Sequence, residues 1–234
     1  MAKQSLIIFC ILFLVINASD PEPRDLVEEA YQQLFELQNI AYGEIFVGRD
    51  RLQHLQREFG DDAQKVAQKA NLDIEQEHET INIQLTTIKD LALSAGKDIS
   101  SCTNNREDLL NSLPANYNEQ ISSCMAGVAQ LAATAVTDSR YFIDILINKV
   151  HQFGYQLDLC YENFECISPL LTQILLERVR IPQVVREEVQ NCETIISELE
   201  LSVQNCADES VAEYTVEASG ILAEITDCVD EIIG

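Results

Sequence analysis

The cysteines are the residues of this sequence with the clearest capacity for chemistry. Seven of them lie beyond the N-terminal segment: Cys102, Cys124, Cys160, Cys166, Cys192, Cys206 and Cys228. Cys160 and Cys166 stand closest together, in LDLCYENFECISPLL, and a pair at this spacing can bind a metal, cycle between thiol and disulfide, or form a structural bond. Zinc sites need closely spaced Cys and His ligands, and the sequence has no CxxC or HExxH motif. We therefore expect structural disulfides and no cofactor.

Histidines and carboxylates offer a second kind of chemistry. The stretch DIEQEHE places Glu75, Glu77 and Glu79 around His78, but helical phase puts only Glu75 and Glu79 on one face. This spacing favours a solvated helix surface over an acid–base or metal site. The other histidines, His54 and His151, are isolated in the sequence. No GxSxG, P-loop, GxGxxG or EF-hand pattern occurs, so we expect no catalysis.

The first residues read MAKQSLIIFCILFLVINASDPEP, with Lys3 ahead of an apolar run from Leu6 to Ile16. A short apolar run after a basic residue is typical of a secretory signal peptide, which we place at residues 1–18. The run is shorter than the roughly 20 residues that span a bilayer. We expect a secreted, extracellular protein. The N-x-S sequon Asn17–Ser19 straddles the cleavage point, so N-glycosylation is not expected.

The net charge is strongly negative, at −24 from 39 acidic and 15 basic residues. Nucleic acids and anionic membranes are bound by clusters of Lys and Arg, so the charge disfavours both as partners. From Glu187 to Gly234 there are 13 acidic residues and no basic one, which we interpret as a solvated helix surface.

The spacing of apolar residues at three and four positions, with eight glycines and five prolines, predicts an all-α protein. We expect an elongated bundle of long antiparallel helices with disulfides in the C-terminal region. One helix is predicted from Asp25 to Gly60 and a second from Asp61 to Ile99. A turn at Gly60–Asp61 would join them into a long helical hairpin within residues 19–101.

Residues 102–234 are predicted to form a disulfide-linked helical domain. Pro114 should end a short helix, and a long helix should follow over residues 115–161. Ser168 and Pro169 match the N-cap and first position of another short helix, and Pro182 should open the last one.

Spacing restricts the disulfide pairing without choosing one. Cys206 and Cys228 are about 33 Å apart along a continuous helix, so they cannot bond to each other. Cys124 and Cys160 are 36 residues apart, and so are Cys192 and Cys228. If the two helices that carry them pack antiparallel, this register would pair Cys124 with Cys228 and Cys160 with Cys192. A direct Cys160–Cys166 bond stays open if that corner is not helical.

The cysteine spacing also resembles a known family. The chain has 21 residues between Cys102 and Cys124 with SLPANY among them, the corner motif at Cys160, and a C-x21-C tail ending at Cys228. Over about residues 100–230 this pattern is similar to a family of insect secreted helical proteins of unknown function, related to the tsetse EP-type domain. The resemblance implies an extracellular insect protein without known catalysis. It also implies six disulfide candidates, with Cys192 as a leftover or intermolecular thiol, which conflicts with the Cys160–Cys192 pairing.

Two functions compete at this level. In the first, the protein is a structural or protein-interaction module whose exposed hairpin, over residues 25–100, binds an unknown protein or a second copy. In the alternative, it carries a small hydrophobic ligand between helices rich in Ala and Ile, such as residues 126–147. Close packing by small residues is the simpler interpretation of that segment.

Overall fold

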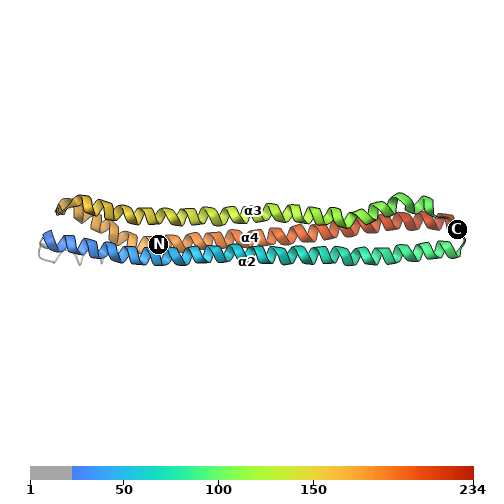
Figure 1. Cartoon of the computed structure of the whole chain (residues 1–234), viewed down its shortest axis with the longest axis horizontal. Helices are drawn as coiled ribbons and strands as arrows, with labels where there is room; N and C mark the ends of the chain where they lie inside the picture. The colour runs from blue at the N-terminus through green and yellow to red at the C-terminus, as the bar shows by residue number, and fades with distance from the viewer. Residues whose placement is uncertain (1–22) are drawn as a thin grey trace, which may run out of the picture. The chain divides into compact units, whose positions relative to one another are not determined.

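The computed structural model describes residues 23–234, and within them the fold is all-helical. The helices are α2 (Pro23–Ser94), α3 (Ser100–Cys160) and α4 (Phe164–Ile233), shown in Figure 1. Neighbouring helices in the chain pack antiparallel, which confirms the predicted fold class. The predicted signal peptide and sequon lie outside the described residues. Within those residues, no helix has a stretch long and apolar enough to cross a membrane.

The turn from α2 to α3 is built by local backbone chemistry. Gly96 has a φ of 68°, a left-handed conformation that glycine adopts without steric cost. The Gly96 N–H donates to the Leu93 carbonyl and the Lys97 N–H to the Ala92 carbonyl, the hydrogen-bond pattern of a Schellman motif. Asp98 then caps α3, because its Oδ1 accepts the Ser100 N–H at 2.9 Å.

A single continuous α2 replaces the predicted hairpin, so the turn expected at Gly60–Asp61 is wrong. Gly60 lies in helical conformation on the surface, where its cost relative to Ala is only about 1 kcal/mol. Buried apolar residues lie on both sides of it, with Leu55 and Phe59 before it and Ala70 and Ile74 after it, and Val66 between them is partly buried. The free energy gained by burying these apolar residues exceeds the cost of one residue with low helix propensity.

The helix boundaries predicted at three prolines are also wrong, both the end expected at Pro114 and the starts expected at Pro169 and Pro182. Pro114 lies inside α3, and Pro169 and Pro182 lie inside α4. Each lacks the N–H that would bond to the carbonyl four residues earlier, a loss of about 3 kcal/mol that bends a helix. Figure 1 shows α3 bending near its N-terminal end and the opening turns of α4 running obliquely. The helices continue because Leu113 and Ile181, next to these prolines, are buried in cores.

Contacts divide the chain into two compact units, each with a segment of all three described helices. Among the described residues, unit 1 contains residues 23–50 together with Arg140–Val189. Unit 2 contains Arg51–Ser139 together with Gln190–Gly234. This grouping differs from the predicted division between residues 101 and 102, because α3 and α4 return along α2 and contribute to both units.

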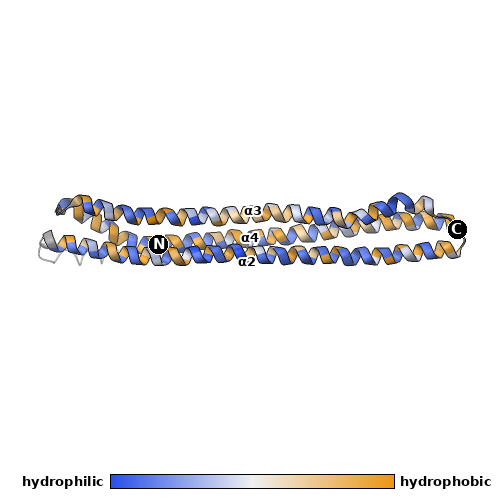
Figure 2. Cartoon of the chain, in the orientation of Figure 1, coloured by the Kyte–Doolittle hydropathy of each residue, from blue (hydrophilic) through white to orange (hydrophobic). Residues whose placement is uncertain are grey.

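Each unit has its own apolar core. In unit 1, Gly48 lets α4 approach α2 closely: a Cβ at this position would lie 2.8 Å from Val185 Cγ1. The buried side chains of unit 1 include Leu37, Ile45, Ile143, Ile174 and Val185. In unit 2 the core includes Ile74, Leu110, Leu113, Ile121, Tyr214 and Ile225. Figure 2 shows hydrophobic and hydrophilic colours alternating along each helix, as expected when one side of a helix faces a core.

Candidate functional site

Two of the disulfides join α3 to α4 inside unit 2. Cys102 bonds to Cys228 with a Cα–Cα distance of 5.7 Å, and Cys124 bonds to Cys206 at 6.0 Å. The predicted pairing of Cys124 with Cys228 is therefore wrong. The observed pairing instead matches two equal spacings of 22 residues, from Cys102 to Cys124 on α3 and from Cys206 to Cys228 on α4. When the two helices run antiparallel, these equal spacings bring both pairs of cysteines level with each other. This signal was present in the sequence.

The third disulfide described closes the corner between α3 and α4. Cys160 and Cys166 bond directly, and the predicted Cys160–Cys192 pairing is also wrong. The corner is not helical at residues 161–163, and Asn163 caps α4 by accepting the Glu165 N–H at 3.0 Å. Helix α4 therefore starts at Phe164, before the predicted Ser168–Pro169 cap.

Cys192 is buried and does not belong to these three disulfides. The six bonded cysteines are the six that the sequence analysis named as disulfide candidates. Within residues 23–234, no group of three or more His, Cys, Asp or Glu side chains is placed to hold a metal ion.

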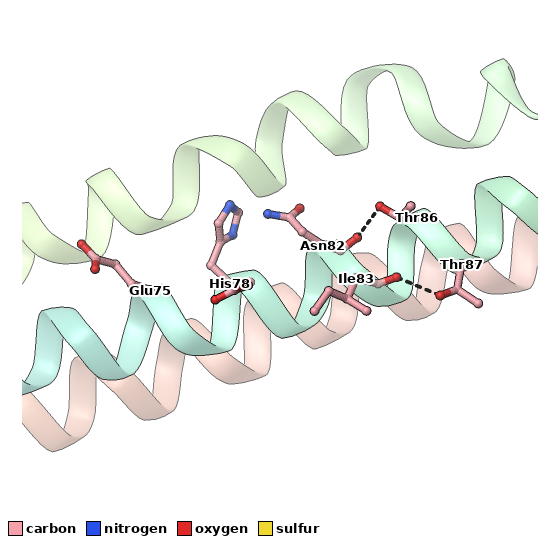
Figure 3. A pocket seen from close by; sticks show the side chains of 7 residues that line it. Glu75, His78, Asn82, Ile83, Thr86 and Thr87 are labelled. Atoms are coloured by element: carbon pink, nitrogen blue, oxygen red, sulfur yellow. Dashed lines mark hydrogen bonds between the residues drawn. The ribbon is translucent and has the colours of Figure 1, made fainter.

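A polar groove lies along one face of α2 in unit 2. Its lining residues all come from this helix: Glu75, His78, Glu79, Asn82, Ile83, Thr86 and Thr87. Figure 3 shows His78 and Asn82 extending from α2 toward the neighbouring helix. Thr86 and Thr87 each donate their hydroxyl to a carbonyl one turn earlier in α2. Their hydroxyls thus serve the helix itself, and the other groups that line the groove are two carboxylates, one imidazole, the Asn82 amide and the apolar side chain of Ile83.

His78 belongs to a polar contact that reaches into the core. Its Nδ1 lies 3.0 Å from the hydroxyl of Tyr214, which is fully buried. Burial lowers the pKa of His78, which favours the neutral imidazole that can accept the Tyr214 O–H. Burial, followed by the negative charge of Glu77, raises the pKa of Tyr214 to about 12. Tyr214 therefore keeps its proton at neutral pH and acts as a structural donor rather than a base.

Tyr117 of α3 completes this cluster. Its ring meets that of Tyr214 edge to face, with 5.7 Å between centroids, and its hydroxyl donates to Glu217 at 2.7 Å. Burial first, and then the hydrogen bond to Glu217, raise the pKa of Tyr117 to about 12. The cluster joins the three helices of unit 2 through satisfied polar groups, and it leaves neither a nucleophile nor a base poised for reaction.

The remaining histidines have ordinary surroundings. His54 lies on the surface of unit 2, with its Nε2 3.0 Å from Glu58. His151 lies in unit 1, where its ring meets the ring of Tyr42 at an angle, with 6.0 Å between centroids. The three histidines that the sequence analysis considered thus stay apart from one another.

A row of aromatic residues on α2, of which all but the half-buried Tyr42 are exposed, is the clearest surface feature of unit 1. Tyr31, Phe35, Tyr42 and Phe46, which we call the aromatic seam, follow one another at intervals of four, seven and four residues. This spacing puts them on one face of the helix. Phe35 is 62% exposed and Phe46 is 74% exposed. The apolar periodicity predicted the buried face of this helix, but the second, aromatic stripe was not predicted.

Contacts with α3 fix the position of the seam. The Tyr31 hydroxyl donates to Asp158 at 2.8 Å, and Tyr42 lies against His151. Tyr155, which is 66% exposed, falls between His151 and Asp158 on the same face of α3. The aromatic seam and Tyr155 therefore lie on the same side of unit 1.

Comparison of the chain with protein family models, with curated proteins and with solved structures yields no match. The function of the protein is therefore inferred from the geometry of the seam, the groove and the disulfides. The class of protein that this geometry defines is a disulfide-bonded bundle of three long helices.

Proposed function

We propose that this protein is a non-catalytic protein-interaction module of the extracellular space, and that the aromatic seam of unit 1 is its contact surface. The observation that carries the proposal is the exposure of Phe35 and Phe46 on an uncharged stripe of α2. Aromatic side chains contribute much of the energy of protein interfaces, because each can bury a large area at a small cost in conformational entropy.

The distribution of exposed apolar residues supports this choice of surface. Within residues 25–234, fifteen of the twenty-three exposed large hydrophobic side chains belong to unit 1, although unit 1 is the smaller unit. Eight of these fifteen are aromatic, whereas the exposed hydrophobic residues of unit 2 are all aliphatic. Exposed aromatic residues gathered in this way are typical of binding surfaces.

The disulfides support the extracellular part of the proposal. Disulfides persist in oxidising compartments and are rare in the cytosol. Bonds that join Cys102 to Cys228 and Cys124 to Cys206 agree with the secretion that the N-terminal sequence predicts. Kinship with the insect secreted helical proteins is part of the same proposal and rests on the cysteine spacing alone.

A carrier of a small hydrophobic ligand is the weaker candidate. In the Ala-rich segment of α3 that prompted it, Val128, Ala132 and Val136 are buried. Native mass spectrometry of the secreted protein checks this alternative directly. A hydrophobic molecule that co-purifies in stoichiometric amount would favour the carrier over the interaction module.

The test of the interaction module uses a photoreactive phenylalanine analogue at Phe35 in the secreted full chain. Irradiation should give protein adducts, because this side chain lies on the proposed contact surface. The matched control carries the same analogue at Ile83, which is 61% exposed on α2 within unit 2. Absence of protein adducts at Phe35, or equal adducts at both positions, would sink the proposal.

A further inference from the structure

We infer that the partner of the aromatic seam is a second copy of this chain, packed antiparallel so that α2 lies on α2. This inference rests on the proposed function and names the partner of that surface. Three features of the described residues carry it: the spacing of the aromatic residues, the charges at the ends of the seam, and the exposed area.

The intervals between the seam residues, of four, seven and four residues, have the same order from either end of the helix. In an antiparallel pair with its two-fold axis between Gln38 and Asn39, Tyr31 of one copy lies level with Phe46 of the other, and Phe35 lies level with Tyr42. Self-complementarity of this kind is what a two-fold symmetric contact requires, because one patch must bind its own copy. A parallel arrangement would instead place every residue opposite itself.

The charges at the two ends of the seam are complementary in the same register. Glu28, exposed before Tyr31, lies level with Arg49 of the second copy, since both are equally far from the axis. Arg49 donates to Asp144 of its own chain at 2.8 Å and carries further N–H groups that can bind Glu28. Within this register, each α2 brings a carboxylate to a guanidinium rather than to a like charge.

The two acidic residues of α2 that lie between Tyr31 and Phe46 do not oppose the contact. Glu36 and Glu44 already bind Arg178 and Arg186 of α4, which draws them away from the seam. Repulsion between two copies is also weaker at unit 1 than at unit 2. Unit 1, over residues 23–50 and 140–189, carries seven basic and thirteen acidic residues. Unit 2, over residues 51–139 and 190–234, carries seven basic and twenty-four acidic residues. Two copies of this acidic protein therefore meet with least repulsion through unit 1.

The exposed area matches what a dimer needs. Aromatic side chains bury about 150–250 Å² each, so the exposed parts of Tyr31, Phe35, Phe46 and Tyr155 together offer roughly 400–600 Å². A standard interface buries about 800 Å² per partner. The polar residues Gln38 and Asn39 at the axis, with Glu28 and Arg49 at the ends, supply the remainder as a polar rim.

The first experiment measures the mass of the full disulfide-bonded chain by sedimentation and light scattering over a range of concentrations. We expect a dimer whose dissociation constant rises at least 100-fold when Phe35→Glu and Phe46→Glu are combined. The matched control combines Leu72→Glu and Ile83→Glu in unit 2, which have the same spacing of 11 residues on α2 and exposures of 54% and 61%. This control should leave the dimer unchanged, and circular dichroism checks that both variants remain helical.

The second experiment tests the antiparallel register. Glu28→Cys and Arg49→Cys proteins, mixed under mild oxidation, should form a disulfide between chains. Glu28→Cys protein alone should not, because the two copies of residue 28 lie roughly 31 Å apart along antiparallel helices, beyond the reach of a disulfide. A disulfide-linked dimer from Glu28→Cys alone indicates a parallel contact and overturns the inference.

The outcomes separate this inference from the function on which it rests. A chain that is monomeric at every concentration, but whose Phe35 photoadducts contain a different protein, overturns the second copy as partner and leaves the interaction module standing. A dimer that survives both Phe→Glu changes places self-association elsewhere and also overturns the inference. A monomer without photoadducts overturns both proposals.

Discussion

Units 1 and 2 are built from segments of the same helices but stabilised by different means. Unit 2 carries the heavier acidic excess, yet it keeps its aromatic residues, Phe59, Tyr117 and Tyr214, inside. Two disulfides between α3 and α4 hold that unit together against its own repulsion. Unit 1 has a smaller acidic excess, and among its described residues only the corner bond Cys160–Cys166 is a disulfide. The two units thus differ in acidic excess, in covalent cross-linking and in whether their aromatic residues are buried or exposed.

Unit 1 is held by close packing and by ion pairs between helices. Within its described residues, Arg49 binds Asp144, Lys149 binds Glu177, and Arg178 and Arg186 bind Glu36 and Glu44. Unit 2 has such ion pairs as well, between Arg51 and Glu193, Lys89 and Glu107, and Arg106 and Glu224. These pairs are partly exposed, so each contributes little alone, typically below about 1 kcal/mol. These ion pairs act mainly on the alignment of the helices, because a charged partner at a fixed position disfavours a shifted register.

The largest expected effect comes from removing a disulfide of unit 2. Replacing Cys102 and Cys228 by Ala should lower the free energy of unfolding by about 4 kcal/mol, because the bond closes a long loop in the unfolded chain. Replacing Cys160 and Cys166 by Ala should cost only about 2 kcal/mol, since that loop spans six residues. Urea unfolding of both variants measures the difference. Equal losses would contradict the different roles of the two bonds.

A smaller effect is expected from Gly48→Ala in unit 1. The added Cβ would meet Val185 Cγ1 at 2.8 Å and Ile143 Cδ1 at 3.4 Å, and a branched valine on a helix has few alternative rotamers. Overpacking costs about 1–3 kcal/mol, while the better helix propensity of Ala returns about 1 kcal/mol. We expect a net loss of about 1 kcal/mol in urea unfolding, and a stabilised variant would show that α2 and α4 are less closely packed.

Gly60→Ala in unit 2 should have the opposite sign. Gly60 lies on the surface of α2 with nothing within 4 Å of an added Cβ, so the change should stabilise the protein by about 0.5–1 kcal/mol through helix propensity. This variant also checks the continuity of α2. A destabilising effect would indicate a turn at this position, as the sequence first predicted.

The smallest effect concerns pH and the buried contact of His78. Because burial lowers its pKa, the folded protein binds fewer protons here than the unfolded chain, whose His has a pKa of about 6.5. The contribution of this contact is therefore present above pH 6.5 and is lost as pH falls through the lowered folded pKa. Thermal unfolding of the native protein should show a pH-dependent loss below pH 6.5 that His78→Gln lacks.

Three carboxylates near His78, those of Glu75, Glu77 and Glu79, are present in both proteins of that comparison, so only the difference between the two pH profiles reports on the imidazole. Tyr214→Phe provides the matched control, because it removes the hydroxyl that His78 binds while keeping the ring. Identical pH profiles for the native protein and His78→Gln would contradict the assigned role of burial.

Much of the fold was predictable from apolar spacing. The periodicity of three and four residues correctly predicted long antiparallel helices, and the stripe from Leu34 through Leu37 and Ala41 is the buried face of α2. The errors came from local signals. Gly60 and Pro114 weaken a helix by about 1 and 3 kcal/mol respectively, and the sequence alone does not show whether burial around them exceeds those costs.

The candidate site was less predictable for a related reason. Tyr31, Phe35, Tyr42 and Phe46 are spaced like a helical stripe, but a stripe in a sequence does not state whether it faces a core or solvent. The stripe that contains Leu34 and Leu37 already supplies the core, so the aromatic stripe is left outside. That assignment requires the positions of α3 and α4.

The sequence by itself determined that this protein is all-helical, strongly acidic and supplied with enough cysteines for several disulfides. Those properties depend on residue type and local spacing, which act over one or two helical turns. Only the tertiary structure decided which cysteines pair, where the helices end, and which face of α2 stays exposed. Each of these depends on the register between helices far apart in the chain, which is set by the sum of many core contacts rather than by any local signal.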